Sequence, residues 1–164
     1  MTNQLELLIR RAGRKFREYQ VCSIKKIPEE FQQTDCDFYG YTVMGRAILI
    51  EAKMVSRPAL PIGKSPGLLA HQWVALCEAN RANCLALIVW QRGNEIATIS
   101  VDMAVEFSKD RKSIPWALIP TRFKHRHQAD VWRELFDPFL VLPQGAGTTS
   151  EAAPAPASGP ASDP

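Results

Sequence analysis

Residues 34–53 read TDCDFYGYTVMGRAILIEAK, and this stretch organises the rest of the chain. Its pattern predicts two short strands joined by a glycine-containing turn, with the second strand ending in Glu51-Ala52-Lys53. Because strand side chains alternate between faces, Glu51 and Lys53 point one way while Ile50 and Ala52 point the other. A carboxylate and an ammonium group therefore leave an otherwise apolar strand side by side.

Asp37 lies on the preceding predicted strand and can meet Glu51 and Lys53 across the hairpin. Two carboxylates can hold a divalent cation, and a neighbouring lysine can steady an anion. This combination is typical of a metal-dependent nuclease. Asp35 lies on the same face as Asp37, so it is a rival for the role of first acid.

The composition is that of one ordinary globular core, with 164 residues of which 46% are hydrophobic. The sequence contains no run of about 18 apolar residues and no basic-then-apolar start typical of a signal peptide. The formal net charge is +3, and Glu151 and Asp163 are the only charged residues from Pro143 onward, which leaves +5 on the rest of the chain. A mildly basic body suits a polyanionic partner.

Four cysteines lie at positions 22, 36, 77 and 84, without the CxxC spacing of redox or zinc motifs. We interpret them as reduced thiols of a cytoplasmic protein. A zinc site that uses His71, Cys77 and Cys84 is conceivable, but its spacing does not fit the usual ligand patterns.

Apolar residues from Leu5 to Phe16 recur at helical spacing, which predicts an amphipathic helix. Its other faces carry the basic residues Arg10, Arg11, Arg14, Lys15 and Arg17. Such a face is either solvated or in contact with phosphates, and the second interpretation gains weight only beside an active site. Glu6 fits the preference of helix N-termini for acids, which is a structural alternative to any role in a site.

The remaining pattern alternates between strands and helices. Strands are expected at 21–27, 84–90 and 94–100, helices from 65–67 to about 82, at 101–107 and at 128–136, and polar or charged connections at 28–33, 54–66, 109–115 and 120–128. The run at 84–90 is continuously apolar, as in a central strand covered on both faces. This order predicts an α/β fold with a mixed central sheet flanked by helices.

Gln72 falls within the apolar stripe of the predicted second helix, between Leu69 and Leu76. A buried amide without partners costs about 1–3 kcal/mol, so Gln72 needs hydrogen bonds. It either bonds to nearby backbone or supports the metal site and its attacking water. The sequence favours neither interpretation.

The Asp, the Glu-x-Lys triplet and the upstream helical Glu together resemble the PD-(D/E)xK nuclease superfamily, and the wider pattern resembles the RecU-type Holliday junction resolvases. The resemblance spans roughly residues 5 to 120. The matching segments are Leu5-Glu6, Lys25–Pro28, Asp37–Gly40, Gly45–Lys53, Leu60–Ile62, His71-Gln72, Cys84–Trp90 and Arg111–Pro115. Three features depart from the family: Cys36 stands where a proline usually precedes the acid, the hairpin is one residue longer than the usual spacing, and the stalk insertion is reduced to about residues 28–33.

The resemblance implies a restriction-endonuclease-like core and a site that holds Mg²⁺ or Mn²⁺. Asp37, Glu51 and the carbonyl of Ala52 would bind the metal, with help from Glu6. Lys53 would orient the attacking water or stabilise the developing charge. A further group, Gln72, would position the water or a ligand.

The resemblance also implies a homodimer that makes paired cuts in four-way DNA junctions, without a nucleotide cofactor or a membrane partner, in the cytoplasm of a bacterial or phage-infected cell. Residues 1–142 would form the nuclease domain and residues 143–164, rich in Ala, Pro, Ser and Gly, a disordered tail. The residues expected to bind DNA are Arg10, Arg11, Arg14, Lys15, Lys25, Lys26, Arg46, Arg122, Lys124 and Arg126.

Because the stalk is short, we expect loop 54–66 to contribute to junction selectivity instead. Two alternatives remain at this level. The protein is a nuclease of the same fold that acts on flaps, ends or duplex DNA, or it is a non-catalytic DNA-binding or scaffold protein.

Overall fold

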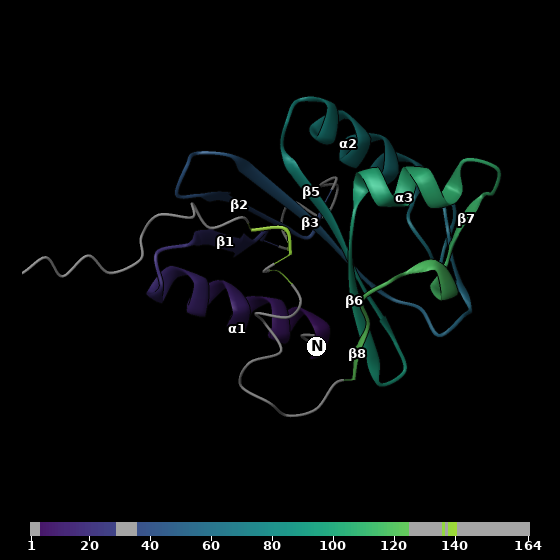
Figure 1. Ribbon diagram of the computed structural model, residues 1–164, viewed down its shortest axis with the longest axis horizontal. Helices are drawn as coiled ribbons and strands as arrows, with labels where there is room; N and C mark the ends of the chain where they lie inside the picture. Colours follow the sequence, from purple (N-terminus) through teal and green to yellow (C-terminus); the bar gives the residue numbers. More distant parts are fainter. Residues whose placement is uncertain (1–3, 29–35, 125–135, 137, 141–164) are drawn as a thin grey trace, which may run out of the picture.

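The computed structural model describes residues 4–28, 36–124, 136 and 138–140 as a six-stranded sheet with helices on both faces (Figure 1). The elements are α1 (Gln4–Glu18), β1 (Cys22–Lys26), β2 (Phe38–Thr42), β3 (Ala47–Met54), β4 (Ala59–Pro61), α2 (Ala70–Arg81), β5 (Leu85–Arg92), β6 (Glu95–Ser100), α3 (Val101–Ser108), β7 (Ser113–Pro115), the 3₁₀ turn η2 (Trp116–Leu118) and β8 (Phe123–Lys124). Helix α1 lies on one side of the sheet, and α2 and α3 lie on the other.

The sheet has the strand order β1-β2-β3-β5-β6-β8. Strands β1, β2 and β3 are antiparallel neighbours, β5 runs parallel to β3, and β6 and β8 return antiparallel. The parallel step from β3 to β5 needs a crossover, which loop 55–69 and α2 supply. The expected mixed α/β fold is confirmed.

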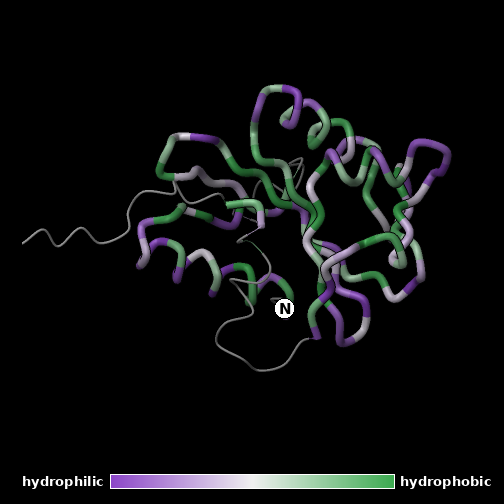
Figure 2. The backbone as a smooth tube through the Cα atoms, in the orientation of Figure 1, coloured by the Kyte–Doolittle hydropathy of each residue, from purple (hydrophilic) through white to green (hydrophobic). Residues whose placement is uncertain are grey.

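Strand β5 separates two hydrophobic cores because its side chains alternate between them. Leu87 and Val89 join the core under α1, whereas Ile88 and Trp90 join the core under α2 and α3. Burial of each of the three aliphatic side chains among these contributes about 1.5–3 kcal/mol. Figure 2 shows α1 alternating between hydrophobic and hydrophilic residues, as a helix with one buried face should.

The opening hairpin forms as predicted between β2 and β3. Its turn is closed by hydrogen bonds from Thr42 N–H to the Arg46 carbonyl at 2.8 Å and from Gly45 N–H to the Thr42 carbonyl at 2.9 Å. Gly45 has φ of +78°, a conformation that glycine adopts without steric cost. Gly40 is required for another reason, since a Cβ there would lie 1.9 Å from the carbonyl oxygen of Ser23 on β1.

The predicted start of the second helix at 65–67 is wrong, because α2 begins at Ala70. The backbone of the preceding residues is already used by the loop. Gly67 donates to the Lys64 carbonyl at 2.9 Å, and Leu68 donates to the Pro61 carbonyl at 2.9 Å. Helical hydrogen bonds therefore start only after Leu69, whose extended backbone caps the helix.

Two segments expected as loops, 54–66 and 109–115, each contain a short strand. Strand β4 pairs antiparallel with β7, and Leu60 lies opposite Ile114 in this pair. Both side chains are fully buried in the core under α2 and α3. Three-residue strands are too short for an alternation signal, so only the contact between distant segments reveals them.

The remaining elements agree with the expected order. Strands β1, β5 and β6 and helix α3 lie within one or two residues of their predicted bounds. The predicted helix at 128–136 falls outside the described residues except for Phe136, which is buried against Phe16 in an edge-to-face contact of 5.6 Å. The expected tail at 143–164 is also outside them, as is Asp35. In the described part of the chain, no helix is long and apolar enough to span a membrane.

Candidate active site

Strand β3 presents Glu51 and Lys53 on the face that α2 covers. Glu51 is 1% exposed, and its Oε1 lies 2.6 Å from the Lys53 Nζ. The alternation predicted for this strand is confirmed, since the preceding Ile50 is buried in the opposite core. A carboxylate that is almost fully shielded from solvent is thus paired with a partly buried ammonium group at the end of a central strand.

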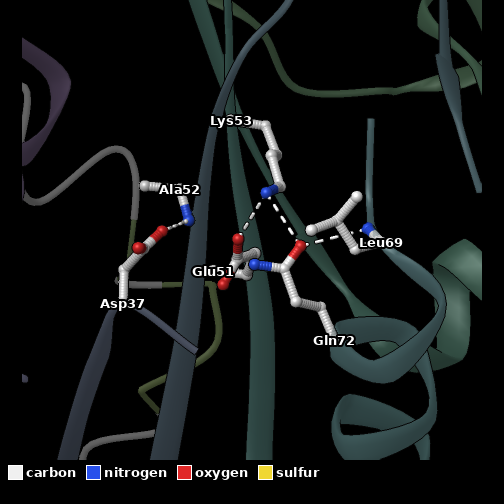
Figure 3. Close-up of polar contacts among 6 residues, drawn as sticks. All are labelled: Asp37, Glu51, Ala52, Lys53, Leu69 and Gln72. Carbon is white, nitrogen blue, oxygen red and sulfur yellow. Dashed lines mark hydrogen bonds and ion pairs between the residues drawn. The ribbon is translucent and has the colours of Figure 1, made fainter. Parts of the chain in front are cut away.

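Gln72, in the first turn of α2, completes this group. Its Oε1 accepts hydrogen bonds from Lys53 Nζ at 2.9 Å and from the Leu69 backbone N–H at 3.1 Å. Figure 3 shows Glu51, Lys53 and Gln72 pointing toward one another between β3 and α2. One oxygen of Gln72 therefore bonds to backbone, as the first interpretation expects, and also to Lys53; a role toward a metal or its water stays a prediction.

Asp37 lies immediately before β2, beside the same segment of β3. Its Oδ2 accepts from the Ala52 N–H at 2.8 Å, and its own N–H donates to the Ile50 carbonyl at 3.1 Å (Figure 3). The carboxylate takes a place in the sheet ladder where a carbonyl would otherwise bond. This arrangement holds the Asp37 side chain close to Glu51 by backbone geometry.

The two acids are electrostatically coupled. Burial and, secondly, the neighbouring Asp37 raise the pKa of Glu51 to about 7, against the opposing effect of Lys53. Burial likewise raises the pKa of Asp37, although the Ala52 N–H and Lys53 act in the other direction. Two crowded carboxylates with raised pKa values favour a neutralising cation.

The donor atoms suit a hard divalent cation. The Oε2 of Glu51 is buried without a hydrogen-bond partner, so it is an oxygen ready for another ligand. Mg²⁺ binds through one or two carboxylates and takes its remaining ligands from water and substrate phosphates. Within the described ranges, no three His, Cys, Asp or Glu side chains cluster for metal binding, so Asp37 and Glu51 form a two-acid set.

Glu6 approaches Asp37 from the side of α1. It forms an ion pair with Lys26 on β1, and both side chains are mostly buried. Glu6 raises the pKa of Asp37 whereas Lys26 lowers it, which places the pair near that carboxylate. The structure thus brings Glu6 near the site, but together with a lysine that the sequence had assigned to DNA.

The other residues expected to bind DNA divide into two groups. The first group is exposed: Arg10, Arg11, Arg14, Lys15, Lys25, Arg122 and Lys124. Lys15 in this group pairs with Glu18 at 2.8 Å. Arg46 is also exposed, but its Nε donates to the Asn83 carbonyl at 2.9 Å and so fixes the turn before β5. Arg126 lies outside the described residues.

One basic cavity was not predicted. Arg57, Lys64 and Lys112 line a cavity of about 350 Å³ beside β4 and β7. These three basic residues are up to 55 positions apart in the sequence, from Arg57 to Lys112, and come from two different loops. The pairing of β4 with β7 brings them together, and that pairing had no signal in the sequence.

No protein-family model matches this chain, and no curated protein matches it at a significant level. Among solved structures, the fold is similar to that of Hjc from Archaeoglobus fulgidus, a Holliday junction resolvase from an archaeal hyperthermophile. The TM-score is 0.50 and the sequence identity is 14%, with 82% of this chain and 99% of that chain covered. The likeness supports the mixed α/β fold described above.

Proposed function

We propose that this protein is a metal-dependent endonuclease of the RecU type that resolves four-way DNA junctions. The observation that carries the proposal is the group formed by the buried Glu51 and the partly buried Asp37, Lys53 and Gln72 around the end of β3. The fold likeness to a Holliday junction resolvase supports the choice of substrate. A paired cut across a junction further calls for a homodimer with two sites.

In this proposal, Asp37 and Glu51 hold Mg²⁺ or Mn²⁺, helped by the Ala52 carbonyl. The metal, when bound, lowers the pKa of water and neutralises charge on the scissile phosphate. The ammonium of Lys53 stabilises charge that develops on the phosphate oxygens or orients the attacking water.

Gln72 positions Lys53 through the 2.9 Å hydrogen bond between Oε1 and Nζ. Because the same oxygen accepts from Leu69 N–H, the amide cannot rotate freely and the lysine has a fixed second anchor. The exposed arginines of α1 contact backbone phosphates without reading bases.

The test is cleavage of a synthetic four-way junction in Mg²⁺ by the parent, Asp37→Asn and Glu51→Gln. Both variants should lose cleavage and retain binding, because each keeps the shape of the side chain but removes a metal ligand. Asp110→Asn and Glu78→Gln are matched controls at exposed positions of the same residue types. Unchanged cleavage by either site variant would show that the site assignment is wrong.

The same assay separates the alternative substrates. A junction, a forked duplex, a flap and a linear duplex of equal length should be cut in that order of preference. Equal cleavage of all four would favour a general nuclease of this fold. Binding without cleavage by the parent in Mg²⁺ and in Mn²⁺ would favour the non-catalytic alternative.

A further inference from the structure

The outer face of β1 and β2 carries two exposed tyrosines in a row. Tyr39 is 46% exposed and Tyr41 57% exposed, so both rings are open to a partner. They lie opposite Lys25 and Ser23 of β1 in the antiparallel register. Within the described residues, α2 packs mainly on β5 and β3 rather than on these two strands (Figure 1).

This face is continuous with the candidate active site. Tyr39 lies opposite Leu49 in the β2–β3 register, so its side chain shares a face with Leu49 and with Glu51 two residues later. A strand rises about 3.4 Å per residue, so Tyr39 and Tyr41 follow each other at about 7 Å intervals along the path away from Glu51. That interval equals two steps of about 3.4 Å between stacked bases.

The far end of the face is hollow and basic. A cavity of about 430 Å³ is lined by Tyr41, Val43, Lys25 and Ser23 from the strands and by Arg17 and Gln20 from the end of α1. Its lining also includes Cys22 and contains no Asp or Glu. Stacking surfaces beside cations are the combination by which proteins hold unpaired nucleic acid.

We propose that this tyrosine face, formed by Lys25, Tyr39, Tyr41 and Arg17, binds the DNA strand that leaves the cleavage site at a branch point. Tyr39 and Tyr41 stack on bases that have lost their neighbours at the branch, and Lys25 and Arg17 bind the flanking phosphates. The inference rests on the proposed function and adds to it the element that distinguishes branched from linear DNA. It supplies a route to selectivity in a chain whose connector at 28–33 is short.

Binding measured in a Glu51→Gln background tests the proposal without cleavage. Tyr39→Ala/Tyr41→Ala should weaken binding to a four-way junction by about tenfold or more, because base stacking on aromatic rings is lost. Its binding to a linear duplex of equal length should change less than about twofold. Tyr39→Phe/Tyr41→Phe keeps both rings and should bind the junction as the parent does.

Each other outcome has a defined meaning. If the alanine and phenylalanine variants bind the junction equally well, or if both kinds of DNA lose affinity equally, the stacking face is wrong. A shift from dimer to monomer in light scattering of the alanine variant also overturns it, since the face would then hold a second copy. Thermal unfolding of each variant checks that the fold persists, and Tyr41→Ala alone serves if the double variant unfolds.

The proposed function can fail separately. A parent that cuts junctions while the alanine variant binds them normally overturns only the tyrosine face. A parent that binds no branched DNA overturns both proposals. A fluorescent base analogue at the junction centre adds a direct measurement, because stacking on Tyr39 or Tyr41 should quench it in the parent and not in the alanine variant.

Discussion

Two glutamate–lysine pairs approach Asp37 from opposite sides of the sheet, and they differ in what surrounds them. Glu51 pairs with Lys53 on the α2 side, where the carboxylate is 1% exposed and keeps one oxygen without a hydrogen bond. Glu6 pairs with Lys26 on the α1 side, where both side chains remain partly accessible. The residue types are the same, so the difference in function that we expect rests on burial of the carboxylate and on the third partner.

That third partner is Gln72 on the α2 side. It anchors the Lys53 ammonium, so this lysine would keep one partner if the glutamate turned toward a metal, as proposed. The Glu6–Lys26 pair is instead set on a helix and an edge strand, which makes it a local charge that tunes Asp37. We therefore expect the Glu51–Lys53 pair to take part in cleavage and the Glu6–Lys26 pair to modulate the charge at Asp37.

The largest expected difference is in cleavage. Glu51→Gln should lower the rate of junction cleavage by about 10³-fold, since it removes a metal ligand from the centre of charge stabilisation. Glu6→Gln should lower it by about tenfold or less. Single-turnover kinetics in saturating Mg²⁺ measures both, and equal losses would place Glu6 among the metal ligands.

The stability of the metal-free protein should depend on the ionisation of Glu51. The pKa of Glu51 is about 7 in the folded protein and near 4.5 in an unfolded chain, so this group's stabilising contribution is complete below pH 4.5 and is lost as the pH rises through 7. Glu51→Gln should thus stabilise the metal-free protein at about pH 8 by up to roughly 3 kcal/mol.

Urea unfolding in EDTA at about pH 5 and pH 8 measures this effect. The gain should be much smaller at the lower pH, because the Glu51 carboxyl is then protonated in the folded parent and partly protonated in the unfolded chain. Glu6→Gln is the comparison variant. A gain from Glu51→Gln that is independent of pH would contradict the assignment of a buried, titrating carboxyl.

Substitution of Lys53 or Lys26 should have a smaller effect, which falls on cleavage rather than on binding. Lys53→Ala should reduce cleavage by about 10²-fold and leave junction binding within about twofold, because its ammonium acts on developing charge. Lys26→Ala should change cleavage less. Binding by anisotropy and cleavage by gel separate these parameters, and a parallel loss of both in Lys53→Ala would indicate a structural role.

The smallest expected effect is a change in salt dependence. Binding of the junction should weaken with salt with a log–log slope of about −0.9 for each phosphate neutralised. Lys25→Gln should make the slope less steep by about one, whereas Lys26→Gln should change it less, since Lys26 is already paired with Glu6. An identical change in both variants would remove this distinction between exposed and paired lysines.

Local patterns in the sequence predicted the parts of the site that lie on one strand. Alternation placed Glu51 and Lys53 on one face, and a continuous apolar run identified β5, because both signals arise from neighbouring residues. The predicted start of α2 at 65–67 was wrong because Gly67 and Leu68 use their backbone N–H groups for hydrogen bonds within the loop. Such competition depends on where Pro61 lies in space, which no local pattern encodes.

Contacts between distant residues could not be predicted. The pair β4–β7 joins segments about fifty residues apart, and its strands are too short for a periodic signal. The sequence likewise left two roles for Gln72, and three-dimensional proximity to Lys53 and Leu69 was needed to show that one oxygen bonds to both residues. The pairing of Glu6 with Lys26 was missed for the same reason.

The side chains of β5 alternate between the two hydrophobic cores, and this couples the unfolding of one core to that of the other. Because the side chains of β5 belong to both hydrophobic cores, unfolding of one core removes part of the packing of the other. The two cores should therefore unfold together. Amide hydrogens of β5 should consequently exchange with solvent only through global unfolding, and those of the neighbouring β3 nearly as slowly. The site at the end of β3 is therefore carried by the most persistent part of the protein, whereas the edge strand β1 can open locally while the site stays formed.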